Sequence, residues 1–410
     1  MKPSVLFINY HSYASFARPG GHALPTAELD LHLVTRTGSH GGLSRFTENP
    51  LDHVHVCTPD VLDEWRSVCE WIIERHSIER VVAVHEGAML LAAELRTTFG
   101  LPGMDSATAL RVRDKVTMKD AVRQAGAAQV PEYAGLDSAD DLMSMDWSTG
   151  RKVIKRRRAL AAIDLHIVES LEHAQRVCGG LDLSDHDFQI EEFIEGEIYH
   201  CDSVVQGGEI VFASVGRYLT NPAAYAPGGV FGTELMGSGE LRDRILKLND
   251  GVVRAVGMPD GATHFELFHT PDDDLVFCEI AGRPPGGIIP HVTEAQYGFN
   301  IIEAAFRLQA GLDVTLDEAE KRRTDGASGF IAFYPGGAVD RGIPATRHAE
   351  LEIVEHIHNS RGGNGAGGVR HSSDFYDSYV IRSADRESLM ARIDQVKKTY
   401  WLTGCGDQKP

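Results

Sequence analysis

Residues 263–280 read THFELFHTPDDDLVFCEI, and this stretch decides the fold. Two apolar-rich runs flank a Pro/Asp segment at residues 271–274, which is typical of an antiparallel β-hairpin. If those four residues form the turn, three facing pairs follow: Thr270 with Leu275, Phe268 with Phe277, and Glu266 with Glu279.

Glu266 and Glu279 would then lie opposite each other on one sheet face, with Cβ atoms about 4.5–5.5 Å apart. Like charges in that position destabilise a hairpin, so the pair needs a compensating charge. A hard divalent cation supplies it, because Mg²⁺ is commonly held by one or two carboxylates together with phosphate oxygens. The hairpin therefore predicts a metal site, and Arg283 follows four residues later.

Length and composition indicate a globular protein of several lobes. The chain has 410 residues and contains no apolar run of about 20 residues, the length of a membrane span. It also does not open like a signal peptide. The net charge of −19 speaks against binding to nucleic acid or to an anionic membrane. A phosphate-bearing ligand would therefore need a local basic pocket.

The cysteines favour a reducing compartment. Six cysteines are scattered along the chain, and none forms a Cys-x-x-Cys pair. This pattern indicates free thiols in a cytoplasmic protein, and not a disulfide framework or a zinc ribbon.

The first hundred residues alternate expected strands with helices, which predicts a small parallel α/β lobe. Later segments mix both types. The expected strands cover residues 4–9, 30–35, 53–58, 80–84, 152–155 and 188–193, and the expected helices cover 61–76, 107–126, 241–256 and 300–311. A last α/β segment is expected from about residue 327 to 403.

Two lysines are candidate phosphate ligands. Lys115 lies on an expected helix within RVRDKVTMK (residues 111–119), where a solvated helix face would have the same pattern. Lys155 ends an apolar strand and precedes three arginines in an otherwise acidic chain. Fixed positive charge at a strand end, near a metal site, suits a polyphosphate.

The segment EEFIEG at residues 191–196 is a strand broken by a glycine. It is either a plain turn or a hinge whose exposed main-chain carbonyl and N–H hydrogen-bond the edge of an adenine.

Other motifs lack the context that their chemistry requires. The GxGxxG string within residues 361–368 has no strand before it and no helix after it, so a surface loop is expected there. No Gly-Lys-Ser/Thr is present, which excludes a P-loop. His356 and His358 share a strand face without a third ligand nearby, which favours a half-buried pair over a zinc site.

In their order and spacing these pieces resemble the ATP-grasp superfamily, over about residues 102–311. The matched segments are Leu101-Pro-Gly with Arg113-Asp-Lys115-x-x-Met-Lys119, Ala125-Gly-Ala with Pro131, Val153-Ile-Lys155, Glu191-Glu-Phe-Ile194-Glu-Gly, Glu266 with Glu279-Ile-Ala-Gly-Arg283, and Gly286-Gly287-Ile with Gly298-Phe-Asn.

The resemblance implies an α/β fold that is α+β in the ATP-grasp lobes. It also implies four regions: an N-terminal parallel α/β domain (1–105), a central A lobe (106–186), a B lobe with the metal site (187–311) and a C-terminal α/β subdomain that completes the core (312–410).

The resemblance implies a role for each matched residue. Lys115 and Lys155 would hold the ATP phosphates, and Arg283 would stabilise an acyl phosphate and the tetrahedral species that follows it. Glu266 and Glu279 would bind two Mg²⁺ ions, for which Mn²⁺ would substitute. Adenine would be bound by the hinge residues Glu191, Glu192, Phe193 and Ile194, and ribose would be bound by Glu197. Gly286 and Gly287 would bind a substrate carboxylate. The substrate sites would be lined by Glu86, His200, Asp202, His264 and Arg283.

The form Glu-Ile-Ala-Gly-Arg (279–283) and the long C-terminal part are similar to the L-amino-acid ligases, which make dipeptides and related amides, often as antibiotics. In such enzymes a carboxylate attacks the γ-phosphate of ATP, and an amine then displaces phosphate. Expected partners are small amino acids or carboxylic acids, with a homodimer left open. Two alternatives remain: an enzyme that activates bicarbonate or formate, and a nucleotide-binding protein without turnover.

Three positions depart from the family pattern. Arginines at residues 156–158 stand where a phosphate-covering loop usually has glycines, and their side chains would replace some backbone contacts. Ala281 replaces a metal-binding asparagine, and the hairpin pairing sets it opposite His264, so no third protein ligand to the metal is expected. Ile198 occupies the usual ribose-binding position, which leaves the neighbouring Glu197 as the candidate.

Overall fold

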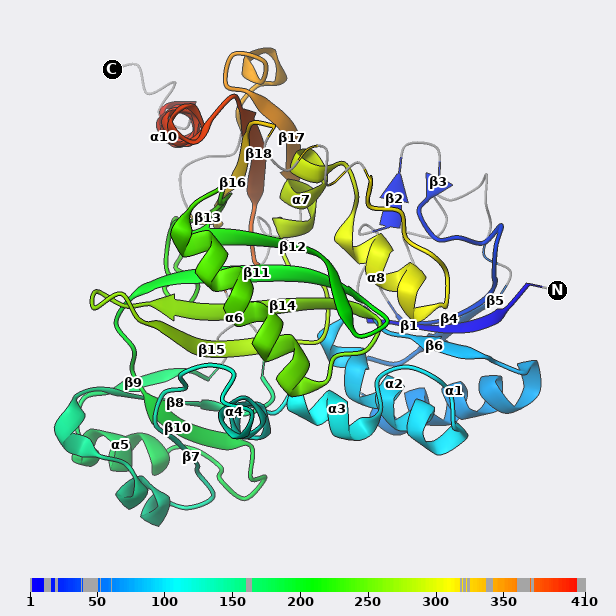
Figure 1. The fold of residues 1–410 in the computed structure, drawn as a ribbon, viewed down its shortest axis with the longest axis horizontal. Coiled ribbons are helices and arrows are strands. Elements are labelled where there is room, and N and C mark those ends of the chain that lie inside the picture. The colour runs from blue at the N-terminus through cyan, green and yellow to red at the C-terminus, as the bar shows by residue number, and fades with distance from the viewer. Residues whose placement is uncertain are drawn as a thin grey trace.

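Strands of the described chain form four β-sheets, and helices pack against the three larger ones (Figure 1). No helix within the described residues is both long enough and apolar enough to cross a bilayer. The computed structural model describes residues 2–10, 16–18, 21–37, 39, 51, 53–59, 61–159, 164–317, 319, 322, 325–336, 342–359, 369 and 372–403.

The N-terminal lobe is the expected parallel α/β unit. Its sheet has the order β5-β4-β1-β6, and every pairing is parallel. Helices α1 and α2 cover one face and α8 covers the other, which is why the strands are apolar on both faces. The elements are β1 (Ser4–Asn9), β2 (Ala17–Arg18), β3 (Gly21–His22), β4 (Asp30–Arg36), β5 (His53–Cys57), α1 (Leu62–His76), β6 (Arg80–Val82) and α2 (Glu86–Phe99).

A smaller antiparallel sheet follows, with the order β7-β10-β8-β9. Because β10 pairs with β8 and β7, this sheet extends beyond residue 186, where the sequence analysis ended the A lobe. Its elements, in which η denotes a short 3-10 helix, are α3 (Ser106–Arg111), α4 (Lys115–Gln124), β7 (Tyr133–Gly135), η3 (Ala139–Ser144), η4 (Trp147–Thr149), β8 (Lys152–Arg156), β9 (His166–Val168), α5 (Leu171–Cys178) and β10 (Phe188–Glu192).

The central feature is an eight-stranded antiparallel sheet with the order β15-β14-β11-β12-β13-β16-β18-β17. Helix α6 packs on one face, and α7 and α8 pack on the other. The C-terminal strands complete this sheet, as expected. Its elements are β11 (Glu197–Gln206), β12 (Glu209–Tyr218), β13 (Val230–Leu235), α6 (Glu240–Val256), β14 (Gly261–His269), β15 (Leu275–Ala281), α7 (Ile289–Tyr297), α8 (Ile301–Gln309), β16 (Ala327–Phe333), η5 (Ala345–Arg347), β17 (Ile353–His358), β18 (Asp377–Ser383) and α10 (Arg386–Thr403).

The hairpin β14–β15 forms with the predicted facing of the two glutamates. Glu266 pairs with Glu279, and His264 pairs with Ala281. The predicted pairs nearer the turn are wrong by one residue, because a β-bulge follows Glu266. Phe268 faces Val276 and not Phe277, while Thr270 does not face Leu275 but lies in the turn, where it accepts a hydrogen bond from the Asp273 N–H at 3.0 Å.

The bulge has a structural purpose. In a regular strand Phe277 and Glu279 would share one face, because side chains two apart point the same way. The extra residue Cys278 lets Phe277 enter the core beside Phe265, at 5.7 Å between ring centroids, while Glu279 faces the cavity described below. The bulge therefore lets Phe277 pack in the core while Glu279 still faces Glu266 at the cavity.

Candidate active site

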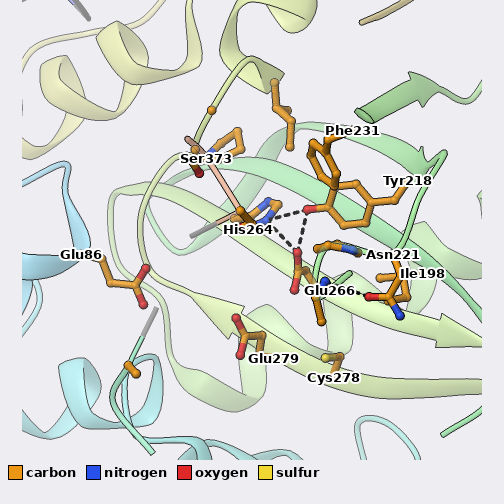
Figure 2. Close-up of a pocket in the computed structure, with 18 of the residues that line it drawn as sticks. Glu86, Ile198, Tyr218, Asn221, Phe231, His264, Glu266, Cys278, Glu279 and Ser373 are labelled. Atoms are coloured by element: carbon orange, nitrogen blue, oxygen red, sulfur yellow. Dashed lines mark hydrogen bonds and ion pairs between the residues drawn. The ribbon is translucent and has the colours of Figure 1, made fainter. Parts of the chain in front are cut away.

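A cavity of about 1190 Å³ lies where the N-terminal lobe, the small sheet and the large sheet meet. Asn9 and Arg36 reach it from the carboxyl ends of β1 and β4, where open parallel sheets commonly bind ligands. Glu266 and Glu279 line this cavity together with Glu86, which comes from the N-terminal lobe (Figure 2). The predicted metal, phosphate and arginine residues therefore share one cavity.

Lys115, Lys155 and Glu191 line the end of the cavity nearest the small sheet, and Lys119 is buried behind Glu191. Glu191 Oε1 lies 2.5 Å from Lys155 Nζ, and Glu191 Oε2 lies 2.8 Å from Lys119 Nζ. Burial alone would raise the pKa of Glu191, but the two ammonium groups lower it to about 2. Lys115 Nζ lies 3.2 Å from Glu279 Oε2 and donates to the carbonyl of Ala159 at 3.0 Å. Lys115 and Lys155 both line the cavity, as expected for phosphate ligands.

Lys119 was not predicted as a site residue, although it lies in the same motif as Lys115. It lies one helical turn after Lys115 on α4, so both point from the same face, and its side chain is completely buried. The i, i+4 spacing was the available signal. Its role is to share Glu191 with Lys155, which fixes the carboxylate between two cations.

The hinge residues Glu192, Phe193 and Ile194 line the cavity where β10 ends. The Phe193 N–H donates to the carbonyl of Arg151 at 3.1 Å, and the Arg151 guanidinium lies 4.1 Å from the Phe193 ring centroid. Within the described residues, no hydrogen bond uses the main chain of Ile194. The hinge thus offers free main-chain groups to a planar ligand.

Glu266 is held by two neighbours at the cavity wall (Figure 2). The Tyr218 hydroxyl donates to Glu266 Oε1 at 2.6 Å, and His264 Nε2 lies 3.3 Å from the same oxygen. Tyr218 was missed by sequence reasoning because it lies 48 residues before Glu266, and only the sheet order brings β12 near β14.

A buried chain of hydrogen-bonded side chains continues behind His264. Asp202 Oδ1 lies 2.6 Å from His264 Nδ1, and Asp202 Oδ2 lies 2.7 Å from His200 Nδ1. His200 Nε2 reaches the hydroxyl of Thr233 at 2.9 Å. Burial would lower the pKa of His264, but Asp202 raises it to about 9. His200 and Asp202, which were expected to line the substrate sites, are fully buried, do not line the cavity and support His264.

Arg283 forms an ion pair that crosses between lobes. Its Nη2 lies 2.7 Å and its Nε 3.0 Å from Glu86 Oε2. Glu86 is the first residue of α2 and also binds Arg113. Burial opposes ionisation of Glu86, but Arg283 and Arg113 lower its pKa to about 2. Glu86 lines the cavity, and its carboxylate orients Arg283.

Gly286 and Gly287 line the cavity just before α7 begins, and this part of its border is called the α7 rim. Gly287 has φ +60°, and a Cβ there would lie 3.4 Å from the Phe375 ring. Ile289 and Pro290, in the first turn of α7, also border the cavity. The rim therefore presents the N-terminus of a helix, which favours a carboxylate.

Glu197 is not brought to the cavity. Side chains alternate along β11, so the cavity-lining Ile198 sends Glu197 to the other face of the sheet. There Glu197 accepts from the Tyr199 hydroxyl at 2.9 Å and lies 3.1 Å from Arg217. The expectation that it contacts ribose does not fit this placement.

The three arginines after Lys155 are ion-paired and do not form a free basic cluster. Each forms an ion pair with at least one aspartate, which anchors the loop. The pairs are Arg156 with Asp164 at 2.7 Å and Asp185 at 2.9 Å, Arg157 with Asp114 at 2.8 Å, and Arg158 with Asp187 at 2.7 Å. Residues 160–163, and the glycine-rich run at 361–368, lie outside the described residues.

Comparison with known proteins shows which proteins the chain resembles in sequence and in fold. No family model matches the chain. An L-arginine-specific L-amino acid ligase of Bacillus subtilis is 27% identical over 275 residues, which span 65% of this chain and just under two thirds (66%) of that protein.

Solved structures share the whole fold. An L-amino acid ligase from Bacillus licheniformis matches with a TM-score of 0.75 and 17% identity, covering 97% of this chain and 98% of that one. Carboxyaminoimidazole ribonucleotide synthase from Aspergillus clavatus, complexed with ATP, matches at 0.72 and 12% identity, with 97% and 98% coverage. The biotin carboxylase domain of 2-oxoglutarate carboxylase from Hydrogenobacter thermophilus matches at 0.71 and 16% identity, with 98% and 90% coverage. The chain therefore has the ATP-grasp fold, and it resembles the L-amino acid ligases in both sequence and structure.

Proposed function

We propose that the protein is an ATP-dependent carboxylate–amine ligase that joins two amino acids, or amino-acid-like acids, through an acyl phosphate, releasing ADP and phosphate. The observation that carries this proposal is the convergence of Lys115, Lys155, the Glu266–Glu279 pair and Arg283 on one cavity. The sequence match to an L-amino acid ligase supports the choice of substrates.

The nucleotide would occupy the end of the cavity beside the small sheet. Lys115 and Lys155 provide two cations for its phosphates, and the free main chain of Ile194 provides hydrogen-bonding groups for adenine. Glu191 does not serve adenine in this arrangement, because both of its oxygens are held by lysines. Its role would be to position Lys155.

Glu266 and Glu279 fit a magnesium site. Their carboxylates are oxygen donors, and their opposite placement in the hairpin needs a compensating cation. Ala281 offers no side-chain oxygen, so phosphate oxygens and water would complete the shell. When bound, Mg²⁺ neutralises phosphate charge and orients the γ-phosphoryl group. Lys115 and Tyr218 keep the two carboxylates aimed at the cavity.

The reacting acid would lie between the hairpin and the α7 rim. Its carboxylate oxygen bonds to the γ-phosphorus while the bond to ADP breaks, which gives the acyl phosphate. The amine nitrogen then bonds to the carbonyl carbon, phosphate leaves with the bonding pair, and the amine proton is lost to solvent. Arg283 would stabilise the negative charge that develops on the carbonyl oxygen, because it is a fixed cation held by Glu86.

The proposal is tested by measuring ADP release with a panel of single amino acids, each with hydroxylamine as a trapping amine. Formation of a hydroxamate that depends on ATP and on the amino acid is the expected result. ADP release that depends on bicarbonate or formate instead would favour the carboxylase-type alternative, which the TM-scores near 0.71 keep open. Absence of ADP release with every acid would identify a nucleotide-binding protein without turnover.

A further inference from the structure

A histidine cluster lies at the edge of the N-terminal sheet, outside the cavity described above. His32 on β4 and His53 on β5 face each other across a parallel pairing, and their rings stack at 4.3 Å between centroids. Asp30 lies two residues before His32 on the same face of β4. His76, in the last turn of α1, places its ring centroid 4.4 Å from that of His32.

His32 is buried without a hydrogen-bond partner. Its side chain is 0% exposed, and neither ring nitrogen finds a partner among the described residues. Burial, together with the neighbouring His53, lowers the pKa of His32. Buried polar groups are normally satisfied by protein, water or an ion, so the orphaned Nε2 of His32, which faces Asp30, indicates a missing ligand. Neutral imidazole is also the form that binds metals.

The distances in the cluster match a metal better than a hydrogen bond. Asp30 Oδ2 lies 3.7 Å from His32 Nε2, and Asp30 Oδ1 lies 3.6 Å from His53 Nε2. Both are too long for a hydrogen bond. Two ligand atoms bound to one tetrahedral Zn²⁺ lie about 3.4 Å apart, given bond lengths of about 2.0–2.2 Å. The carboxylate thus spans the two nitrogens at almost the separation that a shared ion would set.

Two other His/Asp clusters provide a contrast. At Asp202, both imidazole nitrogens lie at 2.6–2.7 Å, and at Asp377 they lie at 2.8–3.0 Å. Those are direct hydrogen bonds that satisfy the carboxylate and the rings. Of the three clusters found among the described residues, the one at Asp30 alone combines an orphaned histidine with separations beyond hydrogen-bonding range.

We propose that Asp30, His32 and His53 bind a divalent transition metal ion of the Zn²⁺ class, with water as a further ligand. Two imidazoles and one carboxylate suit Zn²⁺, and discriminate against Mg²⁺, which prefers oxygen ligands. The His53 ring turns out of its stack on His32 to coordinate, and its side chain, 43% exposed, has room to do so.

The site would be structural. The cluster lies toward the amino ends of β4 and β5, whereas the catalytic cavity lies at the carboxyl ends of the parallel strands. A metal there would fasten the edge strand β5 to β4.

The test is a Zn²⁺ titration of the metal-free full chain by calorimetry, with Mg²⁺ saturating so that the Glu266–Glu279 pair is occupied. The wild type is compared with His53→Ala and Asp30→Asn, which alter exposed side chains and preserve the core. His356→Ala is the matched control, because it removes a histidine from the hydrogen-bonded cluster at Asp377. Co²⁺ absorption in the visible range provides a second readout of coordination by nitrogen ligands.

The wild type and His356→Ala should each bind an equivalent of Zn²⁺ that His53→Ala and Asp30→Asn lose, or bind at least about tenfold more weakly, since even indirect partners of a metal contribute that much. The proposal is overturned if the wild type binds no Zn²⁺ under these conditions, or if His53→Ala retains wild-type affinity and stoichiometry. Equal losses in His53→Ala and His356→Ala would also overturn it.

Discussion

Replacing Tyr218 by phenylalanine tests whether the hydrogen bond from the Tyr218 hydroxyl positions the Glu266 carboxylate for metal binding. The substitution removes one hydroxyl, whose donor–acceptor distance of 2.6 Å to Glu266 Oε1 is that of a charge-assisted hydrogen bond. A hydrogen bond to a charged group contributes about 1.5–3 kcal/mol, which corresponds to a factor of about 10–150. His264, at 3.3 Å from the same oxygen, retains part of the orientation, so the expected loss is near the lower limit.

We expect the Mg²⁺ concentration that half-saturates ADP release to rise about tenfold in Tyr218→Phe, in line with the effect of other indirect metal partners. The rate at saturating Mg²⁺ should change far less, because the phenol does not contact the reacting atoms. The assay is a Mg²⁺ titration of coupled ADP release at saturating ATP and amino acid.

Tyr199→Phe is the matched control. It also removes a hydrogen bond from a tyrosine to a carboxylate, at 2.9 Å to Glu197, but on the opposite face of the same sheet. Its Mg²⁺ dependence should equal that of the wild type. An unchanged Mg²⁺ dependence in Tyr218→Phe, or an equal shift in both variants, would refute the assignment of Glu266 as a metal ligand supported by Tyr218.

Three further predictions concern the same cavity. Glu279→Gln should abolish ADP release while leaving the circular dichroism spectrum intact, because the isosteric amide removes a metal ligand; wild-type turnover would exclude Glu279 from metal binding. Arg283→Ala should reduce amide formation far more than ATP affinity, whereas equal losses would make Arg283 a binding residue. The lowered pKa of Glu191, about 2, means that its ion pairs with Lys119 and Lys155 stabilise the fold fully above about pH 4.5 and progressively less as the pH falls toward 2. Acid unfolding followed by fluorescence should therefore flatten over this window in Glu191→Gln, and an unchanged pH profile would contradict the pairing.

The sequence was sufficient where a short segment carried its own constraint. The Glu266–Glu279 facing followed from a turn and two runs of alternating side chains, and the structure confirms it. The bulge at Cys278 did not follow, because it depends on which face of β15 the core occupies. Phe277 and Ile280 both pack in that core although they are three residues apart, and this spacing is explained only once α6 is in place.

The structure differs from the expected site where distant segments come into contact. Arg156, Arg157 and Arg158 were expected to serve phosphate, but aspartates from three other segments neutralise them. Glu197 was chosen by its position in the motif, whereas strand alternation turns it away from the cavity. Tyr218 could not be found, because its contact with Glu266 exists only through the order of strands in the sheet.

The most direct test of the central claim is identification of the product by mass spectrometry after incubation with pooled amino acids, ATP and Mg²⁺. The account predicts a new amide that forms in equal amount with ADP and phosphate and is absent with Glu279→Gln. Release of ADP and phosphate by the wild type without any amide, across the whole amino-acid pool, would contradict it.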